Sequence, residues 1–120
     1  MLALNPFADA EDLQATSIDE ILRLREPSVY LVRISGDSMQ GAGIFDEDLV
    51  IVDRAKDARH GDIVIAAVNG EPVCKRLHMR HDQLALLPEN SLYPKRYIME
   101  GDEFMIWGVV IHSIRSHGVA

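Results

Sequence analysis

The chain has 120 residues, with 19 acidic and 12 basic side chains and a formal net charge of −7. Apolar residues make up 48% of it, which suits one folded domain with one core rather than a disordered chain. Such an acidic surface repels phosphate backbones, and the sequence contains no zinc-finger spacing, basic helix or aromatic RNA-binding motif. We therefore expect no direct nucleic-acid binding.

The sequence gives no sign of a targeting or membrane segment. The start, "MLALNPFADAEDLQ", lacks a basic region and turns acidic at once, which is not typical of a signal peptide. No apolar run approaches the roughly 20 residues that cross a bilayer. Cys74 is the only cysteine and cannot form an internal disulfide. These features predict a cytoplasmic protein without membrane contact.

Two parts are predicted along the chain: a flexible N-terminal arm over residues 1–16 and a single domain over residues 17–120. The arm shows no clear hydrophobic periodicity. After it, Ser17 and Glu20 fit a capping box before "IDEILRL", so a short helix is predicted there, ending at Pro27. Its expected apolar face consists of Ile18, Ile21 and Leu22.

After this helix the pattern changes to strands rich in β-branched and aromatic residues. The predicted strands are "SVYLVRI", "DLVIVDR", "IVIAAV", "PVCKRL", "QLALLP" and "EFMIWGVVIHSI". "IVIAAV" is continuously apolar, as in a strand that is buried on both faces. Asn69-Gly70 predicts a tight hairpin between "IVIAAV" and "PVCKRL", and "RAKDARHGD" is typical of a turn. The fold class predicted is mostly β, a coiled sheet or partial barrel with a short N-terminal helix.

The stretch "SGDSMQGAG" places Ser38 on a glycine-rich bend after a strand. A serine needs a neighbouring base to act as a nucleophile, and Lys75 is the only lysine inside a predicted strand. Strand alternation puts Val73 and Leu77 on the same face as Lys75, so burial should lower its pKa. Working near neutrality requires a fall of about 3 units from about 10.4, or roughly 4 kcal/mol. A carboxylate beside Lys75 would oppose this, so Asp37 should point away.

From the residues alone, other interpretations stay open. The amine of Lys75 could extend to water, and Gly36, Gly41 and Gly43 could serve only the backbone turns. His78 and His81 have a spacing of three residues but no obvious third ligand, so zinc is not predicted. A packed or partly exposed thiol is the default for Cys74. No metal or cofactor is expected.

Four stretches, "SGDSM", "FDEDLVIVD", "HGDIVIAAVNGEPVCKRL" and "IWGVVIHSI", resemble the UmuD proteins of the LexA-like, S24-type Ser/Lys peptidases. The resemblance runs from about Pro6 to about Ser116. It implies a fold of the LexA C-terminal type, a serine endopeptidase with Ser38 as nucleophile and Lys75 as general base, and a homodimer. It also implies that backbone amides of the bend form an oxyanion hole. The supporting residues of that bend are Gly36, Asp37 and Met39.

The resemblance also implies a role in SOS mutagenesis. A processed UmuD-like dimer joins a Y-family DNA polymerase that copies past lesions, after self-cleavage stimulated by a RecA filament. Family members cut a Cys-Gly or Ala-Gly bond in the arm, whereas here the only such pair is Ala42-Gly43, inside the bend. Self-cleavage is therefore not expected, and the chain is interpreted as a processed or naturally short form. The alternatives are a peptidase that cleaves a partner's arm in trans and the catalytic fragment of a LexA-like repressor. A signal-peptidase relative is disfavoured because no membrane span is present.

Overall fold

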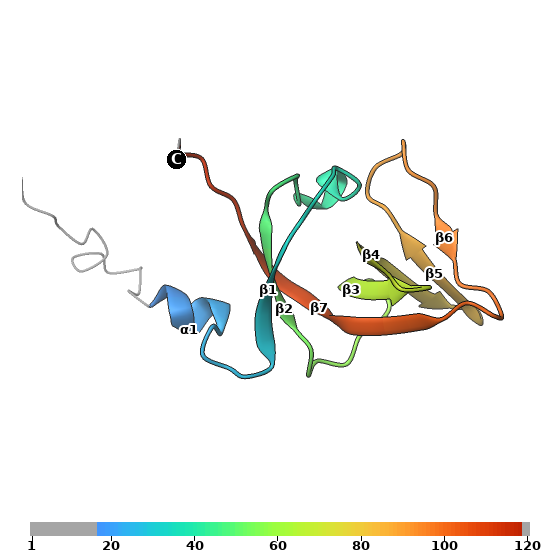
Figure 1. Cartoon of the computed structure of the whole chain (residues 1–120), viewed down its shortest axis with the longest axis horizontal. Coiled ribbons are helices and arrows are strands. Elements are labelled where there is room, and N and C mark those ends of the chain that lie inside the picture. The colour runs from blue at the N-terminus through green and yellow to red at the C-terminus, as the bar shows by residue number, and fades with distance from the viewer. Residues whose placement is uncertain (1–16, 119–120) are drawn as a thin grey trace, which may run out of the picture.

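The computed structural model describes residues 17–118, so the predicted arm lies outside the described residues and the proposed limits of the domain stay a prediction. The described residues form a short helix, one 3₁₀ turn and a mainly antiparallel β structure (Figure 1), as the sequence predicts. The elements are α1 (Ile18–Leu22), β1 (Val29–Arg33), η1 (Gln40–Ala42), β2 (Leu49–Asp53), β3 (Ile63–Val68), β4 (Glu71–Arg80), β5 (Gln83–Leu87), β6 (Arg96–Tyr97) and β7 (Phe104–Ile114).

The strands form one antiparallel sheet in the order β1-β2-β7-β3-β4-β5-β6. The long strand β7 joins the two ends, pairing with β2 along one part and with β3 along another (Figure 1). The register shifts between Ile51 and Val52 and again between Ile65 and Ala66. Such irregularities increase the local twist, which lets one sheet curl around its own side chains. The coiled sheet predicted from the short strands is confirmed.

Two hydrophobic clusters form the core, one on each side of β3. The first lies beneath β1, β2 and the serine bend, and the second lies among β3, β4, β5 and β7. Val64 and Ile65 are neighbours in β3 but belong to different clusters, because successive side chains of a strand point to opposite faces. The prediction that "IVIAAV" is buried on both faces is therefore confirmed. The buried members are Ile34, Met39, Ile44, Val50, Val52 and Ile65 in the first cluster, and Val64, Ala66, Val68, Leu77, Leu86 and Val109 in the second.

The hairpin between β3 and β4 has the turn that its sequence predicts. Asn69 and Gly70 both have positive φ, at 50° and 83°, as a tight primed turn requires. The turn makes Val68 pair with Glu71, and counting back from that pair sets Lys75 opposite Val64. The position of the candidate base in the sheet therefore follows from this turn.

Helix α1 is shorter than predicted. The Ser17 hydroxyl accepts a hydrogen bond from the Glu20 N–H at 3.4 Å, so the predicted cap is confirmed. The predicted end at Pro27 is wrong, because the helix ends at Leu22. Arg23 adopts the left-handed conformation, with φ of 59°, and its N–H bonds back to the helix. This left-handed cap stops the helix before proline is reached.

Candidate active site

The bend that carries Ser38 is anchored on both sides of the serine. Gly36 has φ of +94°, a conformation that glycine adopts without strain, and its N–H donates to Asp46 Oδ1 at 2.7 Å. Met39, directly after the serine, is 1% exposed and packs into the first core cluster. Ser38 itself is half-buried. The bend therefore holds the hydroxyl between a glycine corner and a core side chain.

Lys75, on β4, reaches the serine. Its Nζ lies 2.8 Å from Ser38 Oγ and 3.2 Å from the Cys74 carbonyl oxygen, and the side chain is half-buried. Burial lowers the pKa of Lys75, and the neighbouring Cys74 thiol opposes this to a smaller degree. The two atoms are therefore within proton-transfer distance, and burial shifts the protonation equilibrium of the amine toward its neutral form.

Asp37 faces away from the lysine. Its carboxylate accepts a hydrogen bond from the Tyr93 hydroxyl, which is the largest cause of the raised pKa of Tyr93. The groups that shift the pKa of Lys75 do not include Asp37. This arrangement matches the expectation that no carboxylate holds the amine in its charged form.

The bend also offers hydrogen-bond donors beside the hydroxyl. Within the described residues, no hydrogen bond uses the backbone N–H of Ser38 or of Met39. Free backbone N–H groups next to a nucleophile are the donors that stabilise a developing oxyanion. These two amides are therefore the candidates for that role.

Two surface hollows meet at the serine–lysine pair. The hollow on the Ser38 side has a volume of about 250 Å³, and the one on the Lys75 side has about 490 Å³. Val73 lines both of them, so they adjoin across β4. The first is lined by Val32, Arg33, Ile34, Ser35, Ser38, Met39, Ile65, Pro72, Val73 and Cys74. The second is lined by Val68, Asn69, Glu71, Val73, Lys75, Leu86 and Arg96. The Ser38 hydroxyl and the Lys75 amine thus lie beside two neighbouring hollows.

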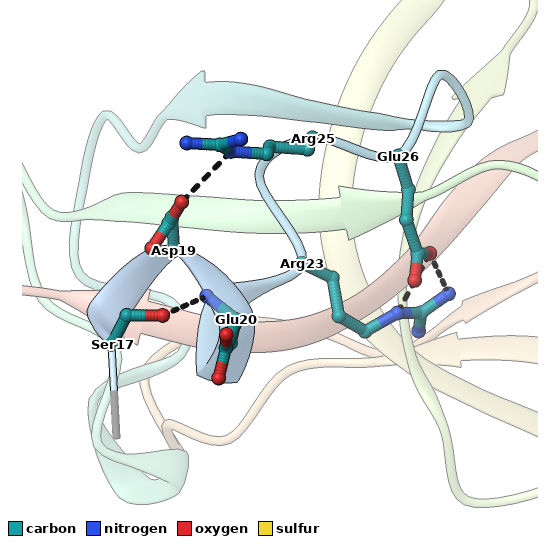
Figure 2. Close-up of a pocket in the computed structure, with 6 residues that line it drawn as sticks. All are labelled: Ser17, Asp19, Glu20, Arg23, Arg25 and Glu26. Atoms are coloured by element: carbon teal, nitrogen blue, oxygen red, sulfur yellow. Dashed lines mark hydrogen bonds and ion pairs between the residues drawn. The ribbon is translucent and has the colours of Figure 1, made fainter. Parts of the chain in front are cut away.

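A larger hollow, of about 530 Å³, lies at α1 and not at this pair (Figure 2). Its lining residues are Ser17, Asp19, Glu20, Arg23, Arg25 and Glu26. Figure 2 shows its charges turned toward one another: Arg25 bonds Asp19 at 2.9 Å and Arg23 bonds Glu26. The Ser17 hydroxyl there caps the helix and also bonds the Asp19 carboxylate, whose pKa this bond lowers, and Asp19 is in turn bonded by Arg25. This larger hollow therefore does not contain the candidate pair.

The histidines form no comparable centre. His78 stacks edge-on against His60, with ring centroids 5.1 Å apart, whereas His81 lies in the β4–β5 turn with φ of 54°. Between residues 17 and 118, no three histidine, cysteine or acidic side chains gather as metal ligands. Over the same range, no helix has the length and hydropathy needed to span a membrane.

Sequence analysis missed several residues that contact the bend. Glu89 and Asn90 bond its backbone, Tyr93 bonds Asp37, and Arg76 bonds Glu89. They lie in or after the predicted strands "PVCKRL" and "QLALLP". Their polarity was the only local signal, and it does not identify a partner far away along the chain.

The fold and the site define a class: a curled, mostly-β domain that brings a serine hydroxyl on a glycine bend against a half-buried lysine amine. The family model described as "Peptidase S24-like" matches residues 3–111. The chain belongs to this family, whose membership suggests serine peptidase activity. The suspected LexA/S24 relationship is thereby confirmed.

Three relatives illustrate the similarity. Protein MucA of Escherichia coli is 43% identical over 98 residues, which cover 80% of this chain and 66% of MucA. The LexA repressor of Syntrophotalea carbinolica is 34% identical over 115 residues, covering 92% of this chain and 57% of the repressor. The LexA repressor of Bordetella pertussis is 39% identical over 87 residues, covering 72% and 40%. The chain thus spans just under two thirds of MucA and about half of these repressors.

Proposed function

We propose that this protein is a serine endopeptidase in which Ser38 is the nucleophile and Lys75 the general base. The observation that carries the proposal is the 2.8 Å separation between Lys75 Nζ and Ser38 Oγ, at an amine whose pKa is lowered by burial. A neutral amine at this distance takes the proton that an attacking hydroxyl must lose.

The reaction has two halves. Ser38 Oγ bonds to the carbonyl carbon of the scissile peptide while its proton passes to Lys75 Nζ, and the Ser38 and Met39 N–H groups hold the oxyanion. The tetrahedral intermediate collapses, the C–N bond breaks, and the ammonium of Lys75 gives its proton to the leaving amine. Water then attacks the acyl-enzyme, loses its proton to Lys75, and frees the acid as Ser38 regains a proton.

The substrate we propose is an extended arm of a related chain, cleaved in trans. Two adjoining hollows with Ser38 on one side and Lys75 on the other suit an extended peptide. The bond to be cut is a Cys-Gly or Ala-Gly bond in that arm, the pair that the UmuD resemblance implies. A homodimer, as the UmuD resemblance implies, would bring the arm and the site together.

A mixing experiment tests this proposal. The arm substrate is the Ser38→Ala variant of this chain, extended at its N-terminus by a segment that contains one Ala-Gly bond. Wild-type protein should cut it at that bond, whereas Ser38→Ala and Lys75→Met should leave it intact. An arm that stays whole with wild type, or is cut equally by Ser38→Ala, would contradict the assigned roles.

A second candidate function is favoured by the identity to MucA and by the resemblance to UmuD proteins. In this role a cytoplasmic homodimer of the chain is the accessory subunit of a Y-family polymerase in SOS translesion synthesis, and a RecA filament is a further partner. The net charge of −7 agrees with leaving DNA contacts to those partners. Co-purification with a Y-family subunit and a change in lesion bypass are expected. The absence of both would instead favour the trans peptidase or a LexA-like repressor fragment.

A further inference from the structure

The segment that follows β5 forms backbone hydrogen bonds with the serine bend. The Glu89 N–H donates to the Ser38 carbonyl at 2.8 Å, and the Glu89 carbonyl accepts from the Gly41 N–H at 2.8 Å. This reciprocal pair resembles the bonding between two antiparallel strands, although neither segment is part of a strand. The backbone at Ser38 is therefore held by one residue of another loop.

Side chains of the same segment add two more bonds. Asn90 Nδ2 donates to the Asp37 carbonyl at 3.0 Å, while Asn90 Oδ1 accepts from the Leu92 N–H at 3.0 Å. The Tyr93 hydroxyl donates to the Asp37 carboxylate. We call residues 88–93 the brace, because they bond the bend on both sides of Ser38.

Gly41 is the point of closest approach between bend and brace. A Cβ at this position would lie 2.6 Å from the Glu89 carbonyl oxygen, nearer than such atoms approach in folded proteins. The obstacle is a backbone atom, so it cannot turn aside as the tip of a side chain would. Glycine is therefore required at position 41, because the backbones of the bend and the brace can approach closely enough to bond only if this position has no side chain.

Arg76 ties the brace to the strand that bears the lysine. Its Nε donates to Glu89 Oε1 and its Nη1 donates to the Gly61 carbonyl at 2.6 Å. Arg76 directly follows Lys75 in β4 and pairs with Leu87 at the end of β5. Two neighbouring residues of β4 thus act on the same serine. Lys75 contacts the Ser38 hydroxyl directly, and Arg76 binds Glu89, whose N–H donates to the Ser38 carbonyl.

We propose that Arg76 is a positioning residue, which acts through Glu89 and the brace to hold Ser38 Oγ at reaction distance from Lys75. The inference rests on the proposed peptidase function and adds residues to it. The Arg76 and Glu89 side chains are 34% and 33% exposed, so their ion pair contributes little to folding stability. Their position has a larger effect, since a displacement of about 1 Å at a reacting group can lower a rate by up to about a hundredfold.

The test is steady-state cleavage of the arm substrate by Arg76→Gln, with thermal unfolding of each variant as a check on folding. We expect kcat to fall about tenfold while KM changes less than twofold, because the substrate contacts stay in place and only the attacking geometry loosens. Arg76→Lys should recover part of kcat, since an ammonium still pairs with Glu89 but lacks the fork that also reaches Gly61. Partial recovery would separate positioning from a general loss of packing.

Gly41→Ala provides an independent variant, since it displaces the brace while both charged side chains of the ion pair are kept, and it should give the same fall in kcat. Arg25→Gln, at an exposed arginine of a different ion pair, is the matched control and should keep wild-type kinetics. Wild-type kcat in folded Arg76→Gln and Gly41→Ala would overturn the proposal. If Arg76→Gln fails to fold, Glu89→Gln and Gly41→Ala decide. Cleavage that persists in Ser38→Ala would instead contradict the peptidase function itself.

Discussion

The guanidinium of Arg115 closes over the buried carboxylate of Asp48. Its Nε and Nη2 donate to the two carboxylate oxygens at 3.0 and 3.2 Å, and Nη2 also reaches the Gly43 carbonyl at 2.9 Å. The same group lies over the Phe45 ring, 3.9 Å from its centroid. The segment after β7 is thereby joined to the loop that leads from the serine bend into β2.

Removing this contact should destabilise the fold. Asp48 is 1% exposed. Among the described residues, Arg115→Ala leaves its buried carboxylate with one hydrogen bond, from the backbone N–H of Phe45. We expect a loss of about 2 kcal/mol in the free energy of unfolding, measured by urea titration. Arg25→Ala, at an exposed pair, should cause no measurable loss. Equal stability of the two variants would contradict a structural role for Arg115.

The same pair predicts a dependence of stability on pH. The bonds from Arg115 are the largest cause of the lowered pKa of Asp48. A carboxyl whose pKa is lower in the folded state stabilises the fold above its unfolded pKa, about 3.9, and loses that effect as pH falls through the folded value. Wild type should therefore lose stability below about pH 4 more steeply than Asp48→Asn does. Parallel curves of stability against pH would disprove this contribution.

Cleavage should accelerate with rising pH. Lys75 must be neutral to accept a proton, and burial lowers its pKa, so the midpoint should lie below the ordinary lysine value of about 10.4. Lys75→Arg keeps its charge at all accessible pH and should lower the rate by about a hundredfold or more. The measurement is the initial rate of arm cleavage between pH 6 and 10. Lys56→Arg, in the exposed turn, is the control that should not alter the profile. A flat profile would rule out Lys75 as the base.

Cys74 should be an unreactive thiol despite lining the hollow beside Ser38. Burial raises its pKa to about 11, with a smaller opposing effect from Lys75. The thiolate is the reactive form, so alkylation at pH 8 should be on the order of 100-fold slower than in the unfolded chain. Iodoacetamide labelling followed by intact mass, with and without guanidinium, measures the ratio. Similar rates in the two states would show an accessible thiolate.

Gly108, inside β7, should tolerate no side chain. A Cβ there would lie 2.5 Å from Val52 Cγ1 and 3.1 Å from the Asp53 carbonyl oxygen, both in buried residues. Gly108→Ala should therefore cost about 2 kcal/mol of stability through overpacking. Gly118→Ala is the matched control, since nothing lies within 4 Å of its added carbon. Thermal or urea unfolding distinguishes the two, and equal midpoints would refute the steric argument.

The strands were predictable because their information is local. Runs such as "IVIAAV" and the Asn69-Gly70 turn carry both the extended conformation and the pairing of β3 with β4. The end of α1 was not predictable, because Arg23 lies beside Asp53, thirty positions along the chain, and bonds it at 2.8 Å. The elements η1 and β6 are only three and two residues long, too short for any periodic pattern.

The candidate site divides in the same way. Ser38 and Lys75 carry local signals, a glycine bend and a lysine between apolar neighbours on one strand face. The brace carries none: Glu89 lies in a polar stretch after a strand, and its partners Arg76, Gly41 and Ser38 are 13, 48 and 51 positions away in the sequence. These residues are brought together by the pairing of β4 with β5. The local sequence around Glu89 does not indicate which distant residues that pairing places beside it.

The two-residue turn at Asn69-Gly70 has a consequence for how this protein can vary. Because side chains alternate along β4, one inserted or deleted residue in the turn would exchange the faces of Lys75 and Arg76. The amine would then leave the serine: a deletion would bring the guanidinium of Arg76, which cannot give up its proton, into register with Val64, and an insertion would bring Cys74 there. The number of residues between the turn and the lysine must therefore stay the same in any homologue that keeps the reaction, and insertions or deletions at this turn should not be tolerated.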